Sequence, residues 1–118
     1  MAYLFISLGA IAGAISRYEV DRLFLPALRS GFPWQTLAIN LSGSFLIGLL
    51  APVLTDQRDL RMLLMVGFCG SFTTFSTYSL EIVRLMQAGK FGISLAYLVL
   101  SAVVAPLACY VGYVLTSR

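Results

Sequence analysis

Four long runs without a charged residue dominate this sequence and limit what it can fold into. They cover residues 2–16, 34–55, 62–80 and 91–117. A helix needs about 20 mostly apolar residues to cross the hydrocarbon of a bilayer. The first run is several residues short, so we expect its helix to continue past Arg17. The pattern predicts an all-α integral membrane protein with four transmembrane helices in a single domain, residues 1–118.

The composition also indicates lipid surroundings. Of the 118 residues, 59% are hydrophobic and 11% are charged, whereas roughly a quarter are charged in a soluble domain. The basic residues lie near the ends of apolar runs, where they can snorkel to headgroups, so they do not form the basic cluster that nucleic-acid binding requires. The chain has no His and 5 acidic residues. We therefore expect no enzyme activity.

Short loops are predicted at residues 25–33, 56–61 and 87–90, which places both termini on one side of the membrane. The basic residues then divide almost evenly between the two sides, so the positive-inside rule gives only a weak orientation preference. Near-balance fits insertion in both orientations, and it also fits chance. On the side of the termini lie Arg58, Arg61 and Arg118; on the other side lie Arg17, Arg22, Arg29, Arg84 and Lys90.

Small and polar residues mark particular faces of the predicted helices. Gly9 and Gly13 form a GxxxG pattern, which permits close helix approach in lipid. Asn40 shares a face of the second helix with the small or polar residues four positions before and after it. Its carboxamide is costly in hydrocarbon unless bonded, and two uses remain open: bonding between helices, or donation to a passing anion. In the fourth helix, Ser94, Tyr97 and Ser101 share one face.

The third run has the sequence least suited to a continuous helix. Residues 67–79 contain two glycines and many hydroxyl or β-branched residues, which have poor helix propensity. We expect a break near the centre of this helix, tolerated only if it is buried in protein or lines an aqueous cavity. Free carbonyls at such a break can bind a cation, and free N–H groups an anion. Phe72, Phe75 and Tyr78 recur every three residues, either for packing or to present positive ring edges.

Residues 70–81, GSFTTFSTYSLE, resemble the signature of the Fluc fluoride channels, the CrcB family. Residues 9–18, GAIAGAISRY, and 36–45, TLAINLSGSF, fit the same family, as does a fourth helix with a Tyr and a Ser in mid-span. The resemblance covers nearly the whole chain. It implies a fluoride-selective channel of the cell (inner) membrane that exports cytoplasmic fluoride by passive conduction and so relieves its toxicity.

The resemblance also implies an assembly and a set of site residues. The assembly is a dual-topology antiparallel homodimer with two pores and a central structural Na+. By motif position the Na+ is bound by the backbone carbonyls of Gly70 and Thr73. Tyr78 departs from the family pattern, where Phe is typical. The resemblance assigns fluoride handling to Asn40, Phe75 and Tyr78, an extended polar path to Ser76, Thr77, Tyr97 and Ser101, and the vestibule to Arg17.

A small multidrug exporter is the main alternative, since it is also a four-helix, dual-topology dimer. Such a transporter needs a membrane-embedded carboxylate in its first helix, and here the first acid is Glu19, after Arg17. The absence of a titratable group at the midplane argues against proton-coupled export. A membrane subunit that only binds partners is not excluded by the sequence.

Overall fold

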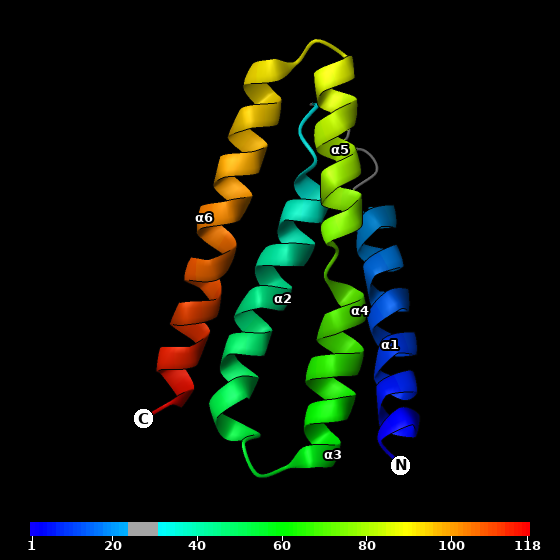
Figure 1. The fold of residues 1–118 in the computed structure, drawn as a ribbon, viewed down its shortest axis with the longest axis vertical. Coiled ribbons are helices and arrows are strands. Elements are labelled where there is room, and N and C mark those ends of the chain that lie inside the picture. The colour runs from blue at the N-terminus through cyan, green and yellow to red at the C-terminus, as the bar shows by residue number, and fades with distance from the viewer. Residues whose placement is uncertain (24–30) are drawn as a thin grey trace.

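The computed structural model describes residues 1–23 and 31–118, and these residues are helical apart from short connections. Most of the predicted loop 25–33, including Arg29, lies outside them. The helices follow one another up and down along the long axis (Figure 1). In chain order they are α1 (Ala2–Leu23), α2 (Trp34–Val53), α3 (Arg58–Leu60), the π-helix η2 (Arg61–Cys69), α4 (Gly70–Phe72), α5 (Phe75–Gln87) and α6 (Phe91–Thr116).

Three stretches of the described chain are long and apolar enough to cross a membrane: α2, residues Arg58–Gln87 and α6. Helix α1 has 22 residues and continues past Arg17 to Leu23, as predicted. It falls short in hydropathy because four of its last seven residues are charged: Arg17, Glu19, Asp21 and Arg22. A spanning role for α1 therefore stays a prediction.

The connections follow the predictions with one correction. Both chain ends lie at the same end of the long axis, on opposite sides of the molecule (Figure 1), which agrees with the expected placement of the termini. The predicted loop at 56–61 is wrong from residue 58 onward, since α3 begins at Arg58 and η2 at Arg61. Asp59 in the first turn of that helix favours an earlier start, because a carboxylate there stabilises the positive end of the helix dipole. Gly89, with φ of 76°, turns the chain between α5 and α6.

Glycines bring the helices together in two closely packed pairs. The most extensive contacts join α2 to α6 and α1 to η2. A Cβ on Gly9 or Gly13 would overlap the carbonyl oxygen of Leu63 or Phe68, so these glycines let α1 approach the third span at backbone distance. A Cβ on Gly48 or Gly112 would likewise overlap a backbone carbonyl in the α2–α6 pair. Without a hydrophobic force between helices in lipid, such close packing supplies much of the association energy.

Few apolar side chains are buried inside the described residues. The buried apolar side chains are Leu37, Ile39, Leu54, Cys69 and Tyr97. Leucine, valine and isoleucine side chains are exposed along α1 and α6, as is usual where helices face acyl chains.

Candidate functional site: a polar cavity at the interruption of the third span

The third span changes conformation at Thr73 and Thr74, between α4 and α5. Thr73 has φ −80° and ψ 155°, and Thr74 has φ −147° and ψ 117°, so both residues are extended. The Thr74 hydroxyl accepts a hydrogen bond from Thr77 N at 3.2 Å and caps the N-terminus of α5. A threonine is favoured there because its side chain satisfies an N–H that has no helical partner.

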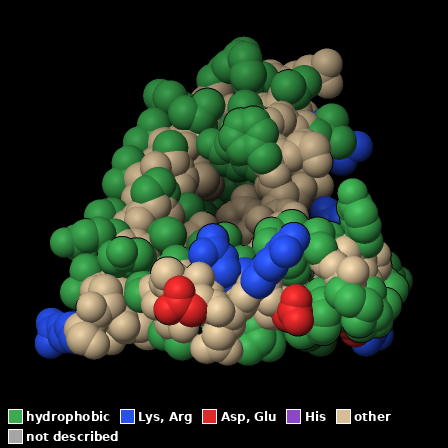
Figure 2. All heavy atoms as spheres, turned by 60° about the horizontal axis from the view of Figure 1, so that its bottom comes forward, with side chains coloured by type: hydrophobic (Ala, Val, Ile, Leu, Met, Phe, Trp, Pro, Cys, Tyr) green, Lys and Arg blue, Asp and Glu red, His purple; other side chains and the backbone are tan. Residues whose placement is uncertain are grey.

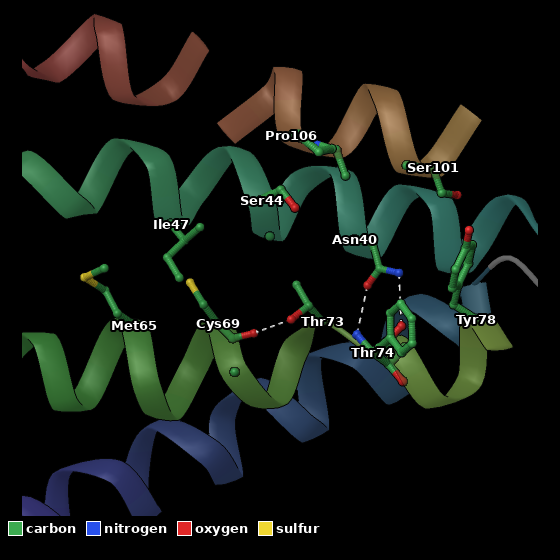
Figure 3. Close-up of a pocket in the computed structure, with 15 residues that line it drawn as sticks. Asn40, Ser44, Ile47, Met65, Cys69, Thr73, Thr74, Tyr78, Ser101 and Pro106 are labelled. Carbon is green, nitrogen blue, oxygen red and sulfur yellow. Dashed lines mark hydrogen bonds between the residues drawn. The ribbon is translucent and has the colours of Figure 1, made fainter. Parts of the chain in front are cut away.

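Asn40 holds this extended segment from the neighbouring helix α2. Thr74 N donates to Asn40 Oδ1 at 2.8 Å, and Asn40 Nδ2 donates to Thr74 O at 3.1 Å (Figure 3). In an unbroken helix the Thr74 N–H would instead donate to the carbonyl of Gly70. The amide thus serves as a bond between helices, the first of the two uses left open by the sequence. One Nδ2 hydrogen remains available, because a carboxamide carries two donors.

A cavity of about 420 Å³ lies beside this segment, between α2, the third span and α6. Six of the residues assigned by resemblance line it. Among the residues that the structure describes, no charged residue lines the cavity, so an ion inside meets only their neutral side chains and backbone. Figure 3 shows its length, from Met65 and Ile47 at one end to Tyr78 and Ser101 at the other. The six residues are Asn40, Gly70, Thr73, Phe75, Tyr78 and Ser101.

Ser101 lines the cavity and carries a buried hydroxyl. Ser101 is only 8% exposed, and its Oγ has no hydrogen-bond partner among the described residues. Burying a hydroxyl without a partner costs free energy, so the site favours a ligand or water that accepts from this group. The predicted common face of α6 is confirmed, because Ser94, Tyr97 and Ser101 are all buried.

Aromatic rings follow the cavity along α5. Tyr78 contacts Tyr97 edge-on, with ring centroids 5.0 Å apart, and Phe75 at 5.6 Å. The Tyr78 hydroxyl donates to Leu98 O on α6 at 3.0 Å, so it is already bonded within the chain. Phe75 is 79% exposed and Gly70 is also exposed, although both lie at the interruption of a span.

A second cavity, of about 380 Å³, lies toward the other end of α5 and includes Glu81 and Thr77. Thr36 donates a short hydrogen bond to one Glu81 oxygen, and the Tyr97 hydroxyl lies 3.5 Å from the other. Glu81 was not among the predicted site residues, although it ends the motif of residues 70–81. Its distance of four residues from Thr77 is the signal that could have pointed to it, because that spacing places both residues on one face of α5.

The remaining predicted residues are dispersed around the two cavities. Ser76 is exposed, and its Oγ lies 3.4 Å from the Thr74 hydroxyl. Tyr97 is fully buried, and its ring contacts Tyr78 of the first cavity and Phe32 of the second. Arg17 is half-buried on α1 and is not among the residues that line either cavity.

The amino-acid sequence matches one family of known proteins. The sequence model described as CrcB-like protein, Camphor Resistance (CrcB), matches residues 4–113. The chain belongs to the CrcB family. Members named fluoride-specific ion channel FluC include one from Magnetococcus marinus, 40% identical over 97% of this chain and 96% of its own length. Another, from Acidobacterium capsulatum, is 39% identical over 100% of this chain and 98% of its own length. A third, from Ruminiclostridium cellulolyticum, is 46% identical over 81% and 77%.

Membership of the CrcB family, together with several membrane-spanning helices, identifies the chain as a multi-pass protein of the cell membrane. The family resemblance expected from the sequence is confirmed over nearly the full length. The individual roles assigned to residues by that resemblance stay predictions.

Proposed function

We propose that this CrcB-family protein is a fluoride-selective channel that conducts passively and exports cytoplasmic fluoride. The observation that carries the proposal is the uncharged cavity at the interruption, where Ser101 offers a buried hydroxyl without a partner. Relatives of nearly the same length are named fluoride-specific ion channels, which supports the choice of ion.

The chemistry of the cavity suits a small, hard anion. Fluoride entering it would exchange part of its hydration shell for donors: the Ser101 hydroxyl and the free Nδ2 hydrogen of Asn40. Phe75 and Thr74 line the cavity, so the positive N-terminal end of α5 also borders it. The rings of Phe75 and Tyr78 carry positive edges that favour an anion.

Neutral donors also explain how conduction can be fast. A channel must bind its ion well enough to admit it and weakly enough to release it. A Lys or Arg in the cavity would hold fluoride too tightly, and none of those in residues 1–23 and 31–118 lines it. Selectivity over chloride then comes from a narrow path and from donors spaced for a small ion.

A second copy of the chain completes the site in this proposal. Gly70 and Phe75 are exposed at the interruption, and backbone that is not paired within a helix is tolerated at membrane depth only against protein or water. A partner in the opposite orientation would cover both. The near-even division of basic residues between the two ends supports insertion in both directions, and two such subunits would give two pores.

The residues at the interruption also fit a structural Na+ in that dimer. The carbonyl of Gly70 does not receive the Thr74 N–H, which is bonded to Asn40 instead, so it remains free to bind a hard cation. Thr73 is extended and continues the same stretch. We assign the Na+ to the carbonyls of Gly70 and Thr73. When bound, the ion would neutralise the negative ends of the helix dipoles that meet there.

The test is ion efflux from liposomes that contain the purified protein. With a potassium ionophore to carry the counter-charge, we expect rapid release of fluoride and none of chloride. Release of both ions, or of neither, would overturn the proposal. Exchange of a cationic drug for protons would instead identify an exporter.

A further inference from the structure

The end of the cavity lined by Met65 and Ile47 lies toward the end of the molecule that carries the termini, because Met65 is near the start of the third span and Ile47 is in the second half of α2. Figure 2 looks at this end and shows a hollow with Lys or Arg side chains at its near edge. In the described residues, the basic side chains in elements at this end are those of Arg58, Arg61 and Arg118. This group includes none of the proposed pore residues, and it does not include Arg17, which the family resemblance assigns to the vestibule.

Arg61 continues the cavity wall by one helical turn. Met65, Cys69 and Thr73 line the cavity at intervals of four residues, and Arg61 precedes Met65 by the same interval. Both Arg61 and Met65 lie in the π-helix η2, whose i→i+5 hydrogen bonds give it wider turns than an α-helix. Arg61 is therefore slightly less than one turn from Met65 and near the same face, toward the end of the span where α3 begins. Arg58 lies three residues earlier and is the first residue of α3.

The guanidinium groups of Arg58 and Arg61 are exposed and not neutralised by a close partner. Within residues 1–23 and 31–118, the one ion pair joins Arg22 to Glu19, at the opposite end. Asp56 and Asp59 share the turn with the two arginines but do not form ion pairs with them. The positive charges of Arg58 and Arg61 therefore act on an ion through the solvent, and the negative charges of Asp56 and Asp59 oppose them.

We infer that Arg61, with Arg58, forms an anion-attracting mouth that raises the fluoride concentration at the end of the cavity lined by Met65 and Ile47. The inference rests on the proposed fluoride conduction. Removing one charge about 10 Å from an ion in water changes the local concentration of the ion about two-fold, and removing two changes it about four-fold, whatever opposing charges lie nearby. The arginines lie outside the cavity, so they attract the ion without holding it in the conduction path.

A different role for these arginines is anchoring to lipid headgroups, which is usual at the ends of spans. The two roles differ in their response to salt. Attraction of an ion through water weakens as the Debye length falls, from about 30 Å at 0.01 M to about 3 Å at 1 M ionic strength. An effect of Arg61 on folding or anchoring would lower flux to a similar degree at both ionic strengths.

The experiment compares fluoride flux through wild type, Arg61→Gln and the double variant with Arg58→Gln, at fixed sub-saturating fluoride. Ionic strength is raised with a large impermeant salt. At low ionic strength we expect a loss of about two-fold for Arg61→Gln and about four-fold for the double variant, and almost none at high ionic strength. Asp59→Asn should raise flux at low ionic strength, because it removes the opposing charge at the mouth.

Arg118→Gln is the matched control, because it makes the same charge change at the C-terminus, on the far side of α2 from α3 (Figure 1). Its flux should follow wild type at both ionic strengths. Equal fluoride flux in wild type and Arg61→Gln at low ionic strength would overturn the proposal that Arg61 attracts fluoride. A loss of flux that persists at high ionic strength would also overturn it. Failure of the wild type to conduct fluoride would overturn the proposed function itself.

Discussion

The two helix pairs and the cavity between them are built in opposite ways. Within the α1–η2 and α2–α6 pairs, glycines let backbones touch, and no space remains for a side chain at Gly9 or Gly48. Between the pairs, the chain leaves a cavity of about 420 Å³, bordered by Ser101 with its unpartnered hydroxyl. The rigidity of the pairs lets the cavity keep polar groups that are not fully bonded, because close-packed backbones resist collapse around them.

The largest effect is expected where the close packing itself is removed. Gly48→Leu places a side chain against the carbonyl of Cys109, which is backbone and cannot turn aside. We expect a loss of about 3 kcal/mol or more, enough to prevent assembly. Thermal denaturation and size-exclusion chromatography in detergent measure this. Gly92→Ala is the control, since nothing lies within 4 Å of a Cβ there. Similar stability of both variants would show that the pairs are not held by backbone contact.

The close packing of the helix pairs was partly predictable from the sequence. The GxxxG pattern of Gly9 and Gly13 predicted a close approach, and the charge-free runs predicted the helices and their short loops. Which helix each glycine faces was not predictable, because in lipid every helix offers an equally apolar surface. The nine-residue π-helix η2 was also not predicted, since such wide turns have no reliable local signal.

The sequence predicted several of the residues that line the cavity, but not the contacts that they make. Asn40 and residues 70–81 were singled out because polar groups and poor helix formers are costly in a span. The pairing of Asn40 with Thr74, 34 positions away, needs the fold to be known. Glu81 was underestimated for the same reason: its hydroxyl partners Thr36 and Tyr97 come from two other helices.

The second largest effect is expected from a charge inside the cavity. Asn40→Asp keeps an acceptor for Thr74 N but replaces the donor with a negative charge. Repulsion between unit charges at about 4 Å is about 4 kcal/mol at an effective dielectric constant of 20. Fluoride flux should fall by about a hundred-fold or more while the protein elutes as wild type does. Ser42→Ala, on the exposed side of α2, should conduct normally. Undiminished flux in Asn40→Asp would remove Asn40 from the path.

Ser101 gives the sharpest contrast between the packed helix pairs and the cavity, because its removal should lower fluoride flux without lowering stability. Ser101→Ala removes a buried hydroxyl that has no partner in the described residues, so stability should stay the same or rise slightly. Flux should fall roughly ten-fold or more, the effect of losing one hydrogen bond to an ion. Liposome efflux and thermal denaturation of the same preparation measure both.

Ser94→Ala supplies the converse control on the same face of α6. The Ser94 hydroxyl donates to Ile82 O at 3.3 Å, within the protein. Its loss should lower stability by about 1 kcal/mol and leave fluoride flux unchanged. If both serine variants lose stability and keep their flux, then Ser101 belongs to the packed regions rather than to the path.

The smallest effect is expected at Tyr78, which belongs to both regions. Its ring borders the cavity, while its hydroxyl bonds Leu98 O and joins α5 to α6. Tyr78→Phe should therefore lower stability by about 1 kcal/mol and change flux by less than about two-fold. Tyr78→Leu removes the ring and its edge-on contact with Tyr97, so its flux should fall much further. A large loss of flux in Tyr78→Phe would mean that fluoride competes with Leu98 for the hydroxyl, and that the donor, not the ring edge, handles the ion at this position.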